Sequence, residues 1–340
     1  MPIIPKFEFK TSLPKCNLDV GFVFQEKKNQ MVCTFSRYGI LSKKLAKDGV
    51  FKGSSKTAQF LPFAGKNGAQ HVVLIGLGTD SQMNAEKFRI AGANLWGECQ
   101  AKKISKVRVS IDNFSYFGKD SESRYLAAFF EGVALSAYRF DRLKTKKKEA
   151  SDTLVVTLVS AKSDAKKSLL PLLERAAQIS EAVRIARDWS NEPSNFGTPE
   201  YFAKEAEKIA KSHGLKCTIL GEKEAEKENM GLFLGVSRGS EREAKLVVLE
   251  HAPPKNSGKT AKTICLVGKG VTFDSGGISL KPGLSMEDMK HDMSGASTLM
   301  GATLLAHAWN APHRVITILA FTENMPDGKA IQPGNVITSR

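Results

Sequence analysis

Four charged residues stand close together in the last quarter of the sequence, among glycines and strand-forming residues. They are two lysines and two aspartates, namely Lys269, Lys281, Asp274 and Asp292. All four lie in the run VGKGVTFDSGGISLKPGLSMEDMKHDMSGAS at 267–297. Charged side chains are rarely buried without a partner. A bound dication is the simplest compensating centre, so the run predicts a metal site.

The types of these residues define the chemistry that such a site could perform. Carboxylate oxygens suit Mn, Mg and Zn. A lysine beside them could stabilise a developing oxyanion as an ammonium, or ligate a metal as a neutral amine. Lys269 and Asp274 end the predicted strand TICLVGKG at 263–270 or follow it. In open α/β sheets, ligands bind at that carboxyl edge.

Simpler roles remain open for each of these residues. Asp292 precedes a predicted helix and could be its N-cap. Asp274 begins DSGG, which is ordinary turn chemistry, and the two lysines could be surface residues. The histidines show no HExxH or HxH spacing, and we expect structural or exposed positions for them. They are His251, His291, His307 and His313.

The motif GVSRG at 235–239 offers a different chemistry, because it fits the G-x-S-x-G pattern of serine hydrolases. That nucleophile elbow needs a strand before it and a helix after it. Here a polar turn and then a strand follow, so a serine hydrolase is not favoured.

The elements that position these residues alternate along the chain. Short apolar runs rich in Val and Ile predict strands at 20–24, 72–78, 106–112, 153–160, 215–220, 245–251, 263–270 and 315–321. Helical patterns occur at 85–103, 123–140, 166–189 and 295–309, and from Thr198, which could cap the helix that Pro199 begins. The alternation predicts an α/β fold, with two α/β domains of mainly parallel or mixed sheets flanked by helices. We assign an N-terminal domain to 1–165, a linker helix to 166–190 and a catalytic domain to 191–340.

Composition narrows the class of protein. The chain has 340 residues, a formal net charge of +15 and five cysteines without a CxxC pair. This cysteine usage argues against disulfides and zinc–thiolate sites and favours a cytoplasmic location. Cys265, in an apolar strand, is expected to be a core residue.

The N-terminus lacks a signal-peptide pattern, and no apolar run is long enough to span a membrane. The basic run RLKTKKK at 142–148 has no interleaved aromatics, so we interpret it as a solvated loop and not as a nucleic-acid patch.

The runs VGKGVTFDSGGISLKP and MEDMKHDMSGA strongly resemble the leucyl aminopeptidase (cytosol aminopeptidase) family of two-metal exopeptidases. The segments 184–206, 231–251 and 323–339 are similar to the family as well. The resemblance implies that the amine of Lys269 ligates one metal, that Asp274 bridges two, and that Asp292 is a second carboxylate on the lysine-bound metal. It implies that Lys281 is catalytic, polarising the scissile carbonyl, and that Met289 lines the pocket for the N-terminal side chain.

The resemblance also implies cofactors and partners. These are two divalent metal ions per subunit, Mn²⁺ or Zn²⁺, a bicarbonate, peptide substrates with apolar N-termini such as Leu, and a homohexamer. The N-terminal part looks like the family's more variable, macro-like domain. The family's Asn-Thr-Asp-Ala-Glu-Gly-Arg motif is absent from these residues. We therefore expect a fragment whose catalytic domain is incomplete and whose own activity is impaired. A degenerate member without activity, or a DNA-binding role, is the alternative.

Overall fold

The structure is a computed structural model that describes residues 5–12, 14, 16–25, 31–35, 38–62, 69–111, 119–145, 153–160, 165–255 and 261–339. The chain divides into two compact units, residues 1–180 and 181–340. The division falls within helix α4 (Ala165–Asn191), which covers the predicted helix at 166–189. Within the described residues, no helix has both the length and the apolar character to cross a membrane.

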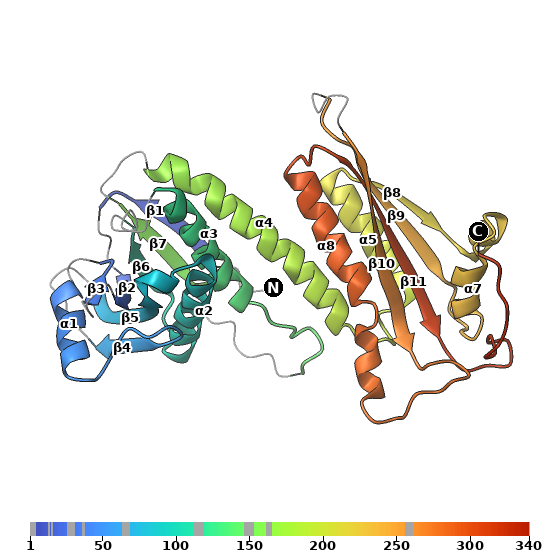
Figure 1. The fold of residues 1–340 in the computed structure, drawn as a ribbon, viewed down its shortest axis with the longest axis horizontal. Coiled ribbons are helices and arrows are strands. Elements are labelled where there is room, and N and C mark those ends of the chain that lie inside the picture. The colour runs from blue at the N-terminus through green and yellow to red at the C-terminus, as the bar shows by residue number, and fades with distance from the viewer. Residues whose placement is uncertain are drawn as a thin grey trace. The chain divides into compact units, whose positions relative to one another are not determined.

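The first unit is built on a sheet of seven strands (Figure 1). They are β1 (Lys6–Lys10), β2 (Cys16–Gln25), β3 (Met31–Cys33), β4 (Ala58–Pro62), β5 (Ala69–Thr79), β6 (Lys106–Ser110) and β7 (Val155–Val159). The strand order is β1-β7-β6-β2-β5-β4, and β3 pairs with β2. The four pairs from β1 to β5 are parallel, whereas β3 and β4 pair antiparallel. The largely parallel sheet predicted from the alternation of elements is confirmed.

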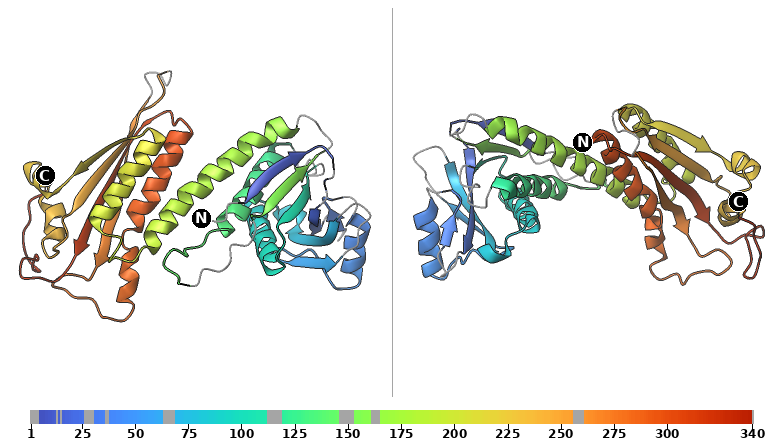
Figure 2. Two further views of the ribbon diagram at one scale, coloured as in Figure 1. Left: turned by 180° about the vertical axis from the view of Figure 1, so that it is seen from behind. Right: turned by 45° about the horizontal axis from the view of Figure 1, so that its top comes forward.

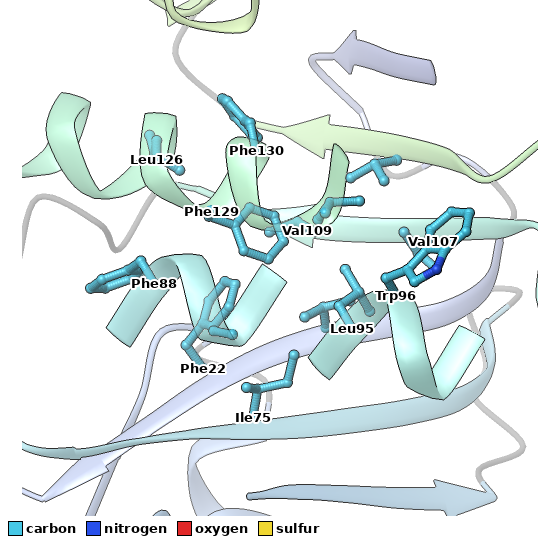
Figure 3. Packing of buried hydrophobic residues seen from close by; sticks show 14 of the residues in the cluster. Phe22, Ile75, Phe88, Leu95, Trp96, Val107, Val109, Leu126, Phe129 and Phe130 are labelled. Atoms are coloured by element: carbon cyan, nitrogen blue, oxygen red, sulfur yellow. The ribbon is translucent and has the colours of Figure 1, made fainter. Parts of the chain in front are cut away.

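Helices cover both faces of this sheet because successive side chains on a strand point to opposite sides. Phe22 packs with α2 (Ala85–Ala101) and α3 (Lys119–Ser136), in the cluster that Figure 3 shows. Its neighbour Val23 belongs to the cluster beneath α1 (Gly39–Lys47). Helices α2 and α3 touch backbone to backbone, since a Cβ on Gly132 would lie 1.9 Å from the carbonyl oxygen of Arg89. The basic run at 142–148 lies partly outside the described residues.

The second unit holds the charged run on a four-stranded mixed sheet with the order β10-β11-β9-β8. Its strands are β8 (Lys216–Leu220), β9 (Lys245–His251), β10 (Thr263–Asp274) and β11 (Arg314–Asn324). Its helices are α5 (Pro199–His213), α6 (Glu222–Lys227), α7 (Gly231–Ser237), the 3-10 helix η6 (Met286–His291) and α8 (Ser294–Ala308). Only β10 and β11 run parallel, and the other two pairs are antiparallel. Figures 1 and 2 show α5 and α8 on one side of the sheet and α7 on the other.

Aromatic rings fill the space between this sheet and its helices. Phe202 of α5 stacks on Phe321 of β11 with ring centroids 5.4 Å apart, and Trp189 lies 5.3 Å from Phe202. The predicted start of α5 is confirmed, because the Thr198 side chain accepts a hydrogen bond from the Tyr201 N–H. These rings join α5 and the end of α4 to β11, the strand that pairs with β10.

The prediction for Cys265 was wrong. Its side chain is exposed, because β10 stands at the end of the strand order and none of the described strands pairs with its outer edge. An apolar run indicates a strand, but it does not tell a central strand from one at the edge.

Candidate metal centre at the end of strand β10

Close backbone packing brings the middle of β10 against the start of α8. The strand was predicted to end at 270, but it continues to Asp274, so Lys269 lies inside the strand and only Asp274 stands at its carboxyl end. A Cβ on Gly268 would lie 2.8 Å from the Cα of Ala296, and one on Gly295 would lie 3.0 Å from the backbone nitrogen of Lys269. Glycine at both positions permits this approach, which a larger residue would prevent. The contact brings Asp292, just before α8, next to Lys269.

Lys269 and Asp292 form an ion pair, with Nζ and Oδ2 2.9 Å apart. The Lys269 side chain is 59% exposed and that of Asp292 22% exposed. The Oδ2 atom itself is buried and accepts no hydrogen bond, so the contact has the distance of an ion pair without the geometry of a hydrogen bond. Buried carboxylate oxygens normally have hydrogen-bond partners. The Lys269 ammonium is the charge partner of this oxygen, and no hydrogen bond within the described residues would compete with a metal cation for it.

Lys281 and Asp274 form the second pair. The ammonium of Lys281 donates to Asp274 Oδ2 at 2.6 Å and approaches the thioether sulfur of Met289 at 3.1 Å. The other oxygen, Asp274 Oδ1, accepts from Asn324 Nδ2 at 2.7 Å and from the Gly276 N–H at 3.0 Å. Asp274 thus has a partner for each oxygen.

These contacts change the acidity of Asp274. Burial acts to raise the pKa of Asp274, but hydrogen bonds from Lys281, Asn324 and the Gly276 N–H outweigh it and lower the pKa below the usual value. The side chain stays ionised when other carboxyls take up protons, as a metal ligand must.

The structure decides two of the simpler roles. Asp292 is not the N-cap of α8, because Met293 holds that position and no side chain caps the helix. Asp274 does make the turn contact to the Gly276 N–H, but through one oxygen only, while the other faces Lys281. Asp274 can therefore be a turn residue and a metal ligand at the same time.

The contacts described above involve no histidine side chain, and three of the four histidines contact other groups. His291 is exposed, whereas His251 is buried, with Nδ1 3.2 Å from Nδ1 of His307 and Nε2 3.0 Å from the carbonyl oxygen of Ala311. The backbone N–H of Lys262 donates to Nδ1 of His313 at 3.4 Å. The structural or exposed positions expected for them agree with these contacts.

The serine motif has no nucleophile elbow. Ser237 ends the short helix α7, is 3% exposed and donates a hydrogen bond to Glu222 Oε1 at 2.9 Å. A buried hydroxyl bound to a carboxylate at the end of a helix lacks the exposed strand-to-helix turn that the elbow needs.

Sequence reasoning missed Asn324, which contacts Asp274 from the end of β11. The signal is the parallel register, since Asp274 pairs with Asn324 where the two strands end. Because the carboxyl ends of parallel strands meet at one edge of a sheet, the residue that ends the next strand was a candidate. Only the pairing of β10 with β11 identifies it.

The residues present fit a divalent cation. Within the described part of the chain, no three or more His, Cys, Asp and Glu side chains are grouped closely enough to hold a metal ion. The site offers instead two carboxylates, each beside a lysine amine, and one buried carboxylate oxygen without a hydrogen bond. Carboxylate oxygens suit Mg, Mn and Zn. Asp274, Asp292 and Lys269 would hold the ion, while Lys281 contacts Asp274.

Comparison with protein families gives two matches. The profile described as "Cytosol aminopeptidase family, catalytic domain" matches residues 184–340. The profile of the same family's N-terminal domain matches residues 22–147. Together the two matches include most of both structural units.

Curated relatives and solved structures agree with these matches. A probable cytosol aminopeptidase of Rickettsia bellii is 35% identical over 304 residues, covering 89% of this chain and 59% of the relative. One from Chromobacterium violaceum is 39% identical over 278 residues, covering 79% of this chain and 51% of the relative. The solved structure of the bottromycin maturation enzyme BotP in complex with Mn superposes with a TM-score of 0.75 at 27% identity, covering 95% of this chain and 63% of that one. The chain thus spans 51% to 59% of the length of these two curated relatives.

Proposed function

This chain belongs to the cytosol aminopeptidase family, and from that premise we propose that it forms the metal centre of an aminopeptidase. The proposed reaction is hydrolysis of the first peptide bond of a peptide, with a preference for Leu or another apolar N-terminal residue. The observation that carries the proposal is the geometry of β10 and of the segment that follows it. There two aspartates each face a lysine, and Asp292 Oδ2 is buried without a hydrogen bond.

The proposed cofactors are two divalent cations, Mn²⁺ or Zn²⁺, together with a bicarbonate. Lys269, Asp274 and Asp292 would hold the ions on this chain. Bound at the site, the cations would polarise the peptide carbonyl and lower the pKa of water from 15.7 towards about 7. The similar BotP structure is a complex with Mn, which supports divalent metal use by a protein of this fold.

Lys281 has the position to stabilise charge during the reaction. Its side chain is 36% exposed, and its ammonium is held by Asp274 Oδ2 on one side and Met289 sulfur on the other. A fixed cation beside a developing oxyanion lowers the barrier, and loss of such a donor typically costs about 10²–10³ in rate. Met289, which contacts this lysine, would border the substrate's N-terminal side chain.

Further proposals concern the oligomeric state, the cellular location and the binding partners of the protein. A homohexamer and a cytoplasmic location rest on the resemblance to the family and on the names of its relatives. Peptides are the proposed partners.

The experiment uses a full-length version that carries the family's Asn-Thr-Asp-Ala-Glu-Gly-Arg motif, because the activity of these 340 residues by themselves is expected to be impaired. It compares the wild type with Lys281→Ala and with Lys329→Ala, a matched change at an exposed lysine. Calorimetric titration measures Mn²⁺ binding, and release of p-nitroaniline from leucine p-nitroanilide measures turnover. We expect Lys281→Ala to keep Mn²⁺ and lose about 10²–10³ in turnover, while Lys329→Ala stays at the wild-type level. Wild-type turnover in Lys281→Ala, or activity that survives removal of metal by a chelator, contradicts the proposal.

A second candidate function follows from the distribution of charge. Residues 1–180 contain 30 of the 50 basic and 16 of the 35 acidic residues, so this unit carries a formal charge of +14 and the other unit +1. Such asymmetry favours a polyanionic partner, and DNA is the one proposed. An electrophoretic mobility shift that weakens steeply between 50 and about 200 mM salt would support it. Binding that salt leaves unchanged would contradict it.

A further inference from the structure

Asn324 ends β11 beside the turn that follows Asp274, and it contacts that turn through both its side chain and its backbone. Its Nδ2 donates to Asp274 Oδ1 at 2.7 Å. Its carbonyl oxygen accepts from the backbone N–H of Ser275 at 3.0 Å and from the Ser275 hydroxyl at 2.8 Å. One residue thus fixes both the direction of the Asp274 side chain and the path of the chain after it.

The amide of Asn324 can face Asp274 in only one orientation. If its oxygen stood where Nδ2 is, two oxygens would meet without a proton between them, because an ionised carboxylate only accepts hydrogen bonds. The Oδ1 atom of Asn324 lies on the side of Gly277, where a Cβ would be 2.7 Å from it. Gly277 has φ +68°, a conformation that glycine adopts readily.

The two oxygens of Asp274 consequently differ in what they can still bind. Oδ1 receives two hydrogen bonds, from Asn324 Nδ2 and from the Gly276 N–H. A carboxylate oxygen has about two lone-pair sites, so these donors fill Oδ1. Oδ2 has one donor, Lys281 Nζ at 2.6 Å, and keeps a site free.

We propose that Asn324 is a positioning residue that occupies Asp274 Oδ1 and thereby presents Oδ2 as the oxygen that binds a divalent cation. This inference rests on the proposed function, which makes Asp274 a ligand. It assigns to Asn324 a role that the pairing of β10 with β11 identifies. Groups that orient a metal ligand by hydrogen bonds typically contribute about 10–100-fold to metal affinity.

Two substitutions separate this role from simple packing. Asn324→Ala removes the donor and most of the side chain. Asn324→Leu removes the donor but keeps a side chain of similar size, so it tests hydrogen bonding alone if the alanine variant fails to fold. Asn335→Ala is the matched control, because the Asn335 side chain accepts one backbone hydrogen bond in an exposed turn, from the N–H of Gln332 at 2.9 Å.

The first measurement is the Mn²⁺ dissociation constant of the wild-type chain and the three variants, by calorimetry. We expect a rise of about 10–100-fold for both Asn324 variants, and the wild-type value for Asn335→Ala. Thermal unfolding without metal shows whether each variant is folded. A folded Asn324→Leu chain with wild-type affinity overturns the proposal.

The second measurement does not depend on metal binding. Metal-free crystal structures of wild type and Asn324→Leu show the direction of the Asp274 carboxylate. We expect the variant's carboxylate to rotate, so that Oδ1 no longer points at the Gly276 N–H. If the wild-type chain binds no Mn²⁺, the proposed function fails, and these structures still decide the role of Asn324: an unrotated carboxylate overturns it and a rotated one supports it.

Discussion

The buried ion pair of the N-terminal unit allows a quantitative prediction. Asp19 on β2 stands opposite Arg108 on β6, and both side chains are 0% exposed. Arg108 binds both carboxylate oxygens, at 2.5 and 2.7 Å. The Tyr38 hydroxyl also donates to Asp19, and Arg108 donates to the carbonyl oxygen of Pro14 at 2.8 Å. Burial acts to lower the pKa of Arg108, but its bonds to Asp19 raise it, so the guanidinium stays charged.

The perturbation is a double-mutant cycle with Asp19→Ala, Arg108→Met and the double variant. Each single change leaves one buried charge without its partner, and that destabilises a protein by about 3–5 kcal/mol. The double change removes both charges, and the Tyr38 hydroxyl, the Pro14 carbonyl and the weakly donating Cys16 thiol lose the hydrogen bonds that they make to this pair. The loss costs about 1–3 kcal/mol for each of the first two. We therefore expect the double variant to be about as destabilised as one single variant, which corresponds to a coupling energy of about 4 kcal/mol.

The assay must follow the N-terminal unit alone, because two units can unfold separately and a single transition is then undefined. Hydrogen exchange measured by mass spectrometry, on peptides covering β2 and β6, reports the free energy of opening of this sheet. The control cycle removes Lys144 and Asp141, an ion pair in the same unit whose side chains are 65% and 30% exposed. Such surface pairs contribute at most about 1 kcal/mol.

The cycle has a clear refuting result. Effects of Asp19→Ala and Arg108→Met that add within about 0.5 kcal/mol would mean that the two charges do not depend on each other. Single effects as small as those of the control pair would mean that water reaches the charges. Either result would refute the reasoning from burial.

Three further predictions concern the second unit and the thiols. Gly268→Ala places a Cβ 2.8 Å from the Cα of Ala296. We expect urea unfolding to show about 1–3 kcal/mol of destabilisation, and we expect Mn²⁺ to bind more weakly. An unchanged free energy of unfolding together with unchanged Mn²⁺ affinity would contradict this account of the packing. The pKa of Asp274 is lowered in the folded state. The ionised carboxylate therefore stabilises the fold fully above the pKa of an unfolded aspartate, near 3.8, and this stabilisation is lost as the pH falls through the pKa of the folded state. Acid unfolding of Asp274→Asn should therefore show a shallower pH dependence in that range than wild type. Cys265 is exposed, whereas burial raises the pKa of the thiols of Cys16 and Cys99 to about 12; we expect one fast reaction with Ellman's reagent, absent in Cys265→Ser.

Much of the fold could be predicted from short stretches of sequence. The strand expected at 245–251 is β9, and α5 begins at Pro199 with Thr198 as its cap. Apolar periodicity, caps and turn residues act over a few positions, so they can be recognised in the sequence. The charged run could be recognised for the same reason, since its lysines, aspartates and glycines follow one another within 31 residues, 267–297.

Partners distant along the chain could not be predicted. Asp19 and Arg108 are 89 residues apart and meet because β2 and β6 are neighbours in that register. Asn324 reaches Asp274 across 50 residues because β10 and β11 run parallel. The exposure of Cys265 likewise depends on the place of β10 in the strand order.

By itself, the sequence determined many of the strands and helices of this protein, the family to which it belongs and the four charged residues in and after β10. The tertiary structure decided which lysine faces which aspartate, which oxygen of Asp274 remains free, and that Asp292 turns to Lys269 and does not cap α8. The physical reason is the separation along the chain over which each kind of interaction acts. Backbone preferences and hydrophobic periodicity act between near neighbours in the chain, whereas ion pairs and hydrogen bonds form only where strand order and register bring side chains within about 3 Å.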